Sequence, residues 1–175
     1  PLALAWIIAI FASLTVHEFS HALMSKLKGD STAEREGRLT LNPIAHLDLF
    51  GLIPLLFFGF GWAKPVPYNP YNLKDPKWDS ARIAVAGPLV NFAIAIVFGL
   101  ILRFIPFENS STFALLPELF TIIIYINIML GVFNLVPIPP LDGSKLLFAF
   151  LGDSQREVIH FLEQNGLVLL LMFML

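Results

Sequence analysis

Apolar residues run along the chain in long blocks separated by short polar segments. Three blocks, residues 2–27, 81–104 and 119–136, are long enough to cross a membrane as helices, because about 20 residues at 1.5 Å each span the roughly 30 Å hydrocarbon layer. A fourth block, residues 49–60, is short and interrupted by glycine and proline. A block of that length predicts a re-entrant or interfacial segment instead of a crossing.

The remaining segments follow other patterns. Residues 37–43 alternate and end in an Asn-Pro turn, which predicts a short strand or hairpin region. Residues 136–143 are rich in proline and cannot form an ordinary continuous helix. From about residue 157 we predict a further C-terminal helix, which becomes wholly apolar from Gly166. Because the chain starts and stops inside apolar runs, we expect flanking segments to be missing and this last helix to be partial.

These elements indicate an all-α polytopic membrane protein, a single domain over residues 1–175 built on a three-helix core, and the composition agrees. Hydrophobic residues make up 57% of the chain and charged residues 14%, against about 25% charged residues in a typical soluble domain. The net charge of −2 offers no basic field for nucleic acid. The chain has no cysteine, so histidine and carboxylate groups would have to hold any zinc ion.

Positive charges indicate how the chain is oriented, because Lys and Arg gather in cytoplasmic loops. If residues 26–48, 62–82 and 137–160 share one side, they hold ten of the eleven Lys and Arg residues, and Arg103 alone faces the other side. We therefore predict that the side with the ten is the cytoplasm. The same arrangement requires residues 49–60 to enter and leave the membrane by one face, in agreement with their short length.

The first apolar block carries the sequence His17-Glu18-Phe19-Ser20-His21 near its end. Two histidines four residues apart lie on one face of a helix and can bind one zinc ion. A carboxylate beside them, here Glu18, can act as the general base of hydrolysis. A chance match is the alternative, but ionisable residues inside a membrane segment are costly and usually mark a function. We therefore predict a zinc centre close to the cytoplasmic end of this helix.

A catalytic zinc ion takes three protein ligands and keeps one position open, so the chain must supply one more donor at the same depth. Asp142 is the best candidate, since it follows the third apolar block on the side where the first block also ends. An ordinary Asp-Gly turn is the alternative interpretation. His46, in a polar loop segment, and His160, on a charged amphipathic face, fit a ligand role less well.

Three short motifs combine polar and small residues within the apolar blocks or at their ends. They are His17-Glu18-x-x-His21, Gly87-Pro88-Leu89-Val90-Asn91 and Asn134-x-x-Pro137-x-Pro139-x-Leu141-Asp142-Gly143. Together they resemble the site-2 protease family of intramembrane zinc metalloproteases, in particular its small bacterial and archaeal members. The resemblance implies a three-helix catalytic core, one zinc ion per chain at His17, His21 and Asp142, and Glu18 as general base. It also implies that the substrates are single-span membrane proteins, cut inside their transmembrane segments.

Amide hydrolysis also needs a donor for the developing oxyanion, and buried amides can provide one. Asn134 and Asn91 both lie in predicted crossings, so either is a candidate catalytic residue, with a hydrogen bond between helices as the alternative for each. The predicted strand at residues 37–43 can offer an edge to an unwound substrate, since extended peptides pair their backbones with such edges.

Two other functions use similar residues. A membrane metal-ion transporter would line its path with the same histidines and aspartate, and a pseudoenzyme would chaperone membrane helices without cutting them. A transporter has no need for a carboxylate directly after the first histidine, whereas hydrolysis requires one. Because Glu18 and the other catalytic positions are intact, we favour a membrane-embedded zinc metalloendopeptidase.

Overall fold

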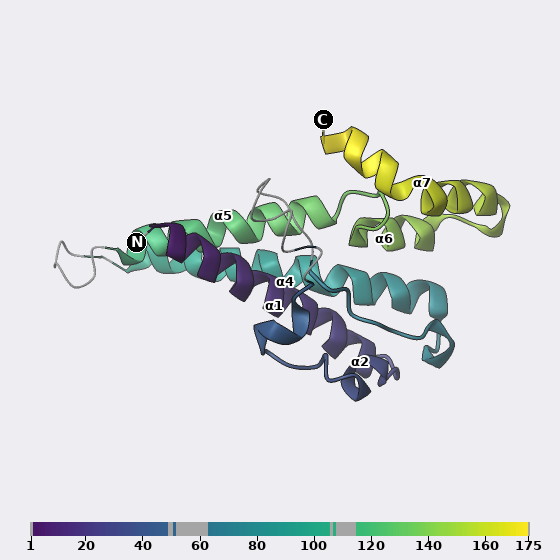
Figure 1. The fold of residues 1–175 in the computed structure, drawn as a ribbon, viewed down its shortest axis with the longest axis horizontal. Helices are drawn as coiled ribbons and strands as arrows, with labels where there is room; N and C mark the ends of the chain where they lie inside the picture. The colour runs from purple at the N-terminus through teal and green to yellow at the C-terminus, as the bar shows by residue number, and fades with distance from the viewer. Residues whose placement is uncertain (1, 49–50, 52–62, 106, 108–114, 175) are drawn as a thin grey trace.

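The computed structural model describes residues 2–48, 51, 63–105, 107 and 115–174, and the described part is mainly helical (Figure 1). Four of its helices are long and apolar enough to cross a membrane, which confirms the predicted all-α polytopic class. They are α1 (Leu2–Leu27), α4 (Pro76–Phe104), α5 (Leu116–Asn134) and α7 (Arg156–Met174). The shorter elements are α2 (Thr32–Arg35), η1 (Pro43–His46), η2 (Pro70–Asn72), α6 (Asp142–Phe150) and η3 (Asp153–Gln155).

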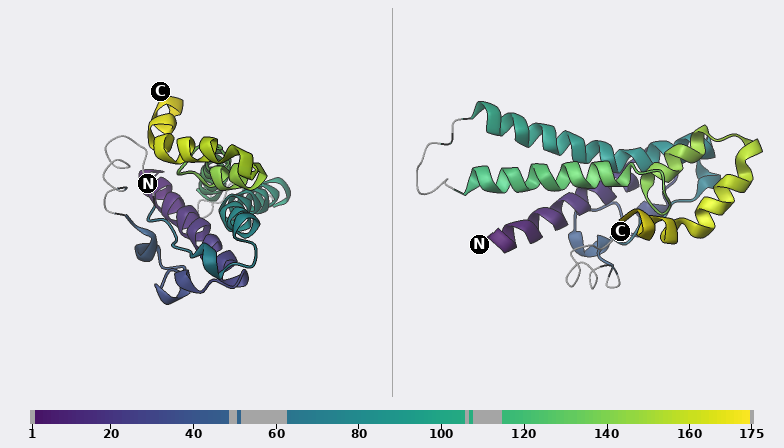
Figure 2. Two further views of the ribbon diagram at one scale, coloured as in Figure 1. Left: turned by 90° about the vertical axis from the view of Figure 1, so that its right-hand side faces the viewer. Right: turned by 90° about the horizontal axis from the view of Figure 1, so that it is seen from above.

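Helices α1, α4 and α5 run lengthwise beside one another and alternate in direction (Figure 2). Helix α4 is central, because it packs against α1, α5 and α6. Its buried face consists largely of small residues, which let neighbouring backbones approach closely inside a membrane. These include Ala81, Ala84, Ala86, Gly87 and Ala95. The end of the bundle where α1 finishes and α4 begins also holds α6 (Figure 1).

Helix α4 begins five residues before the predicted apolar block, at Pro76 instead of residue 81. The reason is local: the carboxylate of Asp75 caps the helix by accepting a hydrogen bond from the backbone N–H of Trp78 at 3.1 Å. Pro76 occupies the first helical position, where the missing N–H costs nothing. Helix α5 is shifted in the same direction, to Leu116–Asn134, and ends before the proline-rich exit.

The predicted strand at residues 37–43 is wrong, since the described part of this region contains only turns and the start of η1. The neighbouring segment that would pair with it contains Pro65 and Pro67, which have no N–H to give to a ladder. In the described residues, the backbone hydrogen bond from this neighbouring segment runs from Lys64 N–H to the carbonyl of His46, beyond residue 43, at 2.9 Å. No strand edge for a substrate is therefore present among these described residues.

The predicted re-entrant segment, residues 49–60, lies outside the described residues apart from Gly51. The segments on either side of it are described. The bond from Lys64 to His46 brings these two flanking segments together.

Asp30 ties the end of α1 to the segment that leads into α4. Its buried carboxylate accepts hydrogen bonds from Ser25, from the backbone and hydroxyl of Thr32, from the backbone of Asn69 and from the amide of Asn72. Burial alone would raise the pKa of Asp30, but the hydrogen bonds have the larger combined effect and lower the pKa to about 2. Asp30 is therefore an ionised anchor that fixes this end of α1 against the approach to α4.

Candidate metal centre

The structure brings the three predicted metal ligands together. His17 and His21 lie one turn apart on α1 and are 3% and 7% exposed, and Asp142 is the first residue of α6. The two Nε2 atoms are 3.0 Å apart. Oδ2 of Asp142 lies 3.2 Å from Nε2 of His17 and 3.3 Å from Nε2 of His21. Among the described residues these three form the one group of His, Cys, Asp or Glu side chains arranged to hold a metal ion.

The spacing of these donors fits zinc. Donors held 2.0–2.1 Å from one tetrahedral ion lie about 3.3 Å from one another, which is close to the observed 3.0–3.3 Å. Oδ2 of Asp142 is buried and has no hydrogen-bond donor of its own. A buried carboxylate oxygen without a donor is costly, and a cation between the three atoms would satisfy it.

The outer nitrogens of both imidazole rings are occupied. Nδ1 of His21 lies 2.7 Å from the carbonyl oxygen of Ile83, and Nδ1 of His17 lies 2.6 Å from Oδ1 of Asn91. Oxygen atoms of this kind only accept, so each Nδ1 must carry the proton, and each neutral ring keeps a lone pair on Nε2. This is the arrangement that metal-binding histidines usually have, with the second nitrogen donating to a neighbouring acceptor.

Gly87 explains how the rings reach α4. A Cβ atom at this position would lie 2.5 Å from Nε2 of His21 and 2.6 Å from Nε2 of His17. Only hydrogen at this position leaves room for both rings. The glycine-proline pair in the middle of an apolar block was the sequence signal for this contact, since small residues in a crossing mark close packing. The carbonyl of Ile83, being a backbone group, leaves no mark in the sequence.

Glu18 is buried on α1 beside the first ligand, with 9% of its surface exposed. His21 follows three residues later on the same helix, and the buried guanidinium of Arg38 donates to the carbonyl oxygens of Lys64 and Pro65. Glu18 therefore lies on α1 between the two candidate histidine ligands. Its catalytic role stays a prediction.

The structure gives the two candidate oxyanion donors other contacts. Both ends of the Asn91 amide are used: the oxygen accepts from His17, and Nδ2 donates to Asn127 at 2.7 Å. The amide of Asn134 donates to the carbonyl of Leu130 in its own helix at 3.0 Å. Asn91 thus supports a candidate ligand, and an oxyanion role for either asparagine stays a prediction.

The two weaker histidine candidates lie outside the cluster. His46 is 2% exposed, and its Nε2 bonds to the carbonyl of Thr40 at 2.8 Å, as expected for a histidine that packs a loop. His160 is exposed on α7 and contacts Gln164 at 2.8 Å.

The Asp-Gly pair at residues 142–143 begins helix α6 instead of forming an isolated turn. The glycine is needed for close packing, because a Cβ atom on Gly143 would lie 2.2 Å from the carbonyl oxygen of Leu135.

Comparison with known proteins gives a consistent result. The model of peptidase family M50 matches residues 5–115 and 105–175. YwhC of Bacillus subtilis is 38% identical over 169 residues, which cover 94% of this chain and 77% of the relative. MJ0392 of Methanocaldococcus jannaschii is 31% identical over 147 residues, and Rip3 of Mycobacterium tuberculosis is 30% identical over 172 residues.

The chain spans 34% of MJ0392 and 37% of Rip3, although it matches 84% and 96% of its own length to them. All three relatives carry the words zinc metalloprotease in their names. No solved structure matches the chain with statistical significance.

We predict that Gly87→Ala weakens zinc binding by at least roughly tenfold, because the added methyl group would displace both ligand nitrogens. Gly99→Ala, in the same helix, is the matched control, since its Cβ would meet no atom within 4 Å. Zinc affinity is measured by competition with a chelator on the purified protein. Equal affinities for the Gly87→Ala variant and the unmodified protein would show that the rings do not rest on this glycine.

Proposed function

The chain belongs to peptidase family M50 and is a multi-pass membrane zinc metalloprotease, and from this premise we propose that it hydrolyses peptide bonds within the transmembrane segments of other proteins. His17, His21 and Asp142 hold the zinc ion, and Glu18 is the general base. The observation that carries this proposal is that three buried acceptor atoms meet, Nε2 of His17, Nε2 of His21 and Oδ2 of Asp142. Both histidine rings hold their proton on Nδ1, which leaves Nε2 free to bind a metal.

Bound zinc supplies Lewis acidity, which polarises a carbonyl group and lowers the pKa of water toward about 7. The other steps belong to the chain. Glu18 takes the proton of the attacking water and delivers it to the amide nitrogen as the C–N bond breaks. Asn91 and the carbonyl of Ile83 hold the two rings in one orientation throughout, so their lone pairs stay aimed at one point.

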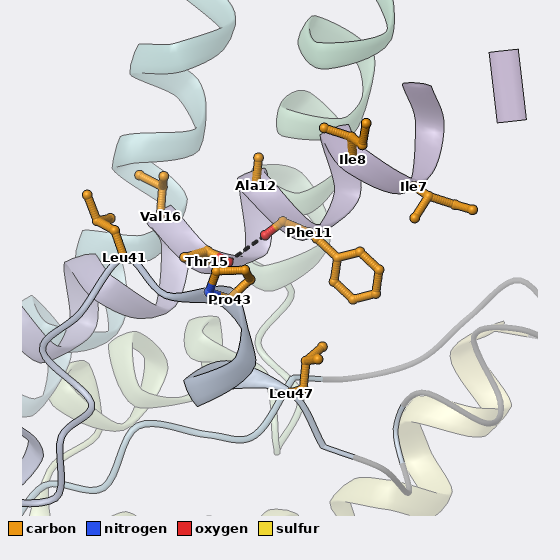
Figure 3. A pocket seen from close by; sticks show the side chains of 9 residues that line it. All are labelled: Ile7, Ile8, Phe11, Ala12, Thr15, Val16, Leu41, Pro43 and Leu47. Atoms are coloured by element: carbon orange, nitrogen blue, oxygen red, sulfur yellow. Dashed lines mark hydrogen bonds between the residues drawn. The ribbon is translucent and has the colours of Figure 1, made fainter. Parts of the chain in front are cut away.

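An apolar groove on α1 is consistent with the proposal that the substrate lies inside the membrane. It has a volume of about 510 Å³ and lies along α1, between Ile7 and Val16 on the helix and Leu41, Pro43 and Leu47 beside it (Figure 3). Its one hydroxyl, on Thr15, already bonds to the carbonyl of Phe11 at 2.6 Å. Phe11, Thr15 and Glu18 are spaced four and three residues apart on α1, so the groove follows the helix face that carries Glu18, whereas His17 and His21 face α4. We propose that single-span membrane proteins supply the apolar segment that lies in this groove.

The charge distribution supports a centre near the cytoplasmic face. His21 lies six residues before the end of α1, or roughly 9 Å along the helix axis. The flanking segments at this end carry most of the Lys and Arg residues, whereas Arg103 lies in the last turn of α4 at the opposite end. The rival prediction of a metal-ion transporter gains no support from the family or from the names of the relatives.

Two substitutions separate the base from the ligands. Glu18→Gln is expected to abolish cleavage of single-span substrates while one zinc ion per chain remains bound, because an amide cannot accept the proton but leaves the three donors in place. Asp142→Asn is expected to weaken zinc binding, since an amide oxygen is a poorer ligand than a carboxylate. Both are measured by metal analysis and by cleavage with the purified proteins. Cleavage at the normal rate by Glu18→Gln, or unchanged zinc affinity in Asp142→Asn, would refute the assigned role.

The orientation is tested with single cysteines, which is simple because the chain has none. Tyr71 is 95% exposed before α4, and Leu115 is 66% exposed at the start of α5. In intact cells, a membrane-impermeant maleimide is expected to label Leu115→Cys and to leave Tyr71→Cys unlabelled until the membrane is opened. The reverse labelling pattern would place the metal centre near the outer face.

A further inference from the structure

The hydrogen bond from His17 to Asn91 is the last step of a longer path through three helices. Nδ2 of Asn91, on α4, donates to Oδ1 of Asn127, on α5, at 2.7 Å. Nδ2 of Asn127 donates in turn to the carbonyl of Ile123 and to Oγ of Ser13, on α1, both at 2.8 Å. Asn91 and Asn127 are fully buried, and Ser13 is 4% exposed.

The hydrogen bonds of this path can run from donor to acceptor in one direction only, and the carbonyl of Ile123 determines that direction. The carbonyl of Ile123 can only accept, so the NH2 end of the Asn127 amide must face it. The oxygen of Asn127 then faces Asn91, which must present its own NH2 end there. The oxygen of Asn91 is thereby left for Nδ1 of His17, as the structure shows.

From this geometry we infer that Asn127 is a positioning residue for the metal centre, because it determines on which nitrogen His17 carries its proton. If the Asn91 amide turned over, its NH2 group would face Nδ1 of His17, and the proton would move to Nε2. That nitrogen could then bind no metal. Asn127 opposes this turn, because two amide oxygens would face each other.

Burial makes this opposition strong. With no exposed surface on Asn91 or Asn127, water cannot satisfy a reversed amide. A buried donor or acceptor left without a partner is costly, because it has lost its hydrogen bonds to water and gains none in the protein. The path therefore extends the control of one zinc ligand to a side chain that contacts neither the ligand cluster nor, by its place on α5, the proposed groove.

The inference rests on zinc binding by His17, as proposed above, but not on proteolysis, so it is tested by metal affinity. We expect Asn127→Leu to weaken zinc binding about tenfold, the lower end of the effect of losing a direct outer partner of a metal ligand, because Asn127 acts on His17 only through Asn91. Asn165→Leu is the matched control, because its amide makes the same bond to a carbonyl four residues earlier, Phe161 at 2.9 Å, on exposed α7. Its zinc affinity should stay unchanged.

Ser13→Ala should reduce zinc affinity less than Asn127→Leu does, a graded effect that is not expected if Asn127 only packs the helices together. It removes one of the two acceptors of the Asn127 NH2 group but leaves the Ile123 carbonyl, so the direction of the path survives. Zinc affinity should fall by less than about threefold. The thermal midpoint of each metal-free variant is measured in parallel, since a purely structural role would lower it and leave zinc affinity unchanged.

Nitrogen-15 NMR of the histidine rings keeps the test decisive if Asn127→Leu does not fold. In the zinc-loaded unmodified protein, His17 should carry its proton on Nδ1 and bind the metal through Nε2. Zinc on Nδ1 of His17, or unchanged zinc affinity in folded Asn127→Leu, would overturn the inference. An unmodified protein that binds no zinc would instead refute the proposed function.

Discussion

The structure depends on one electrostatic constraint: three acceptor atoms with no proton among them meet in a buried space. The Nε2 atoms of His17 and His21 and Oδ2 of Asp142 lie within 3.3 Å of one another. Lone pairs and a negative charge held this closely repel unless a cation lies between them, and burial denies them water. A metal ion bound between the three atoms would remove this repulsion, so its binding would stabilise the folded chain.

Each helix of the core meets a different part of that constraint. In the proposed mechanism, helix α1 supplies two ligands and the general base, α4 supplies the acceptors that fix both rings, and α6 supplies the carboxylate. Gly87 lets α4 approach the rings, and Asn127 on α5 holds Asn91 in its orientation. Helix α1 also carries the apolar groove on another of its faces, so the candidate metal ligands and the proposed substrate surface share one helix.

The parts of this arrangement that are local in sequence could be predicted, because helical spacing alone puts His17 and His21 on one face. Asp142 could also be predicted, because a third ligand must lie at the same depth in the membrane as the two histidines. The hydrogen-bonded path through Asn127 could not be predicted, because it depends on how α4 and α5 are rotated against each other. The strand at residues 37–43 was wrongly predicted because alternation does not show that the partner segment is rich in proline.

X-ray absorption spectroscopy of the zinc-loaded protein tests the central claim most directly, since it reports the ligands themselves. The structure predicts one zinc ion per chain, with two imidazole nitrogens at about 2.0–2.1 Å and a carboxylate oxygen at about 2.0–2.2 Å. Replacing His17 with Ala should remove one imidazole from that shell. A shell with no imidazole, or one unchanged by this substitution, would contradict a zinc centre built on His17, His21 and Asp142.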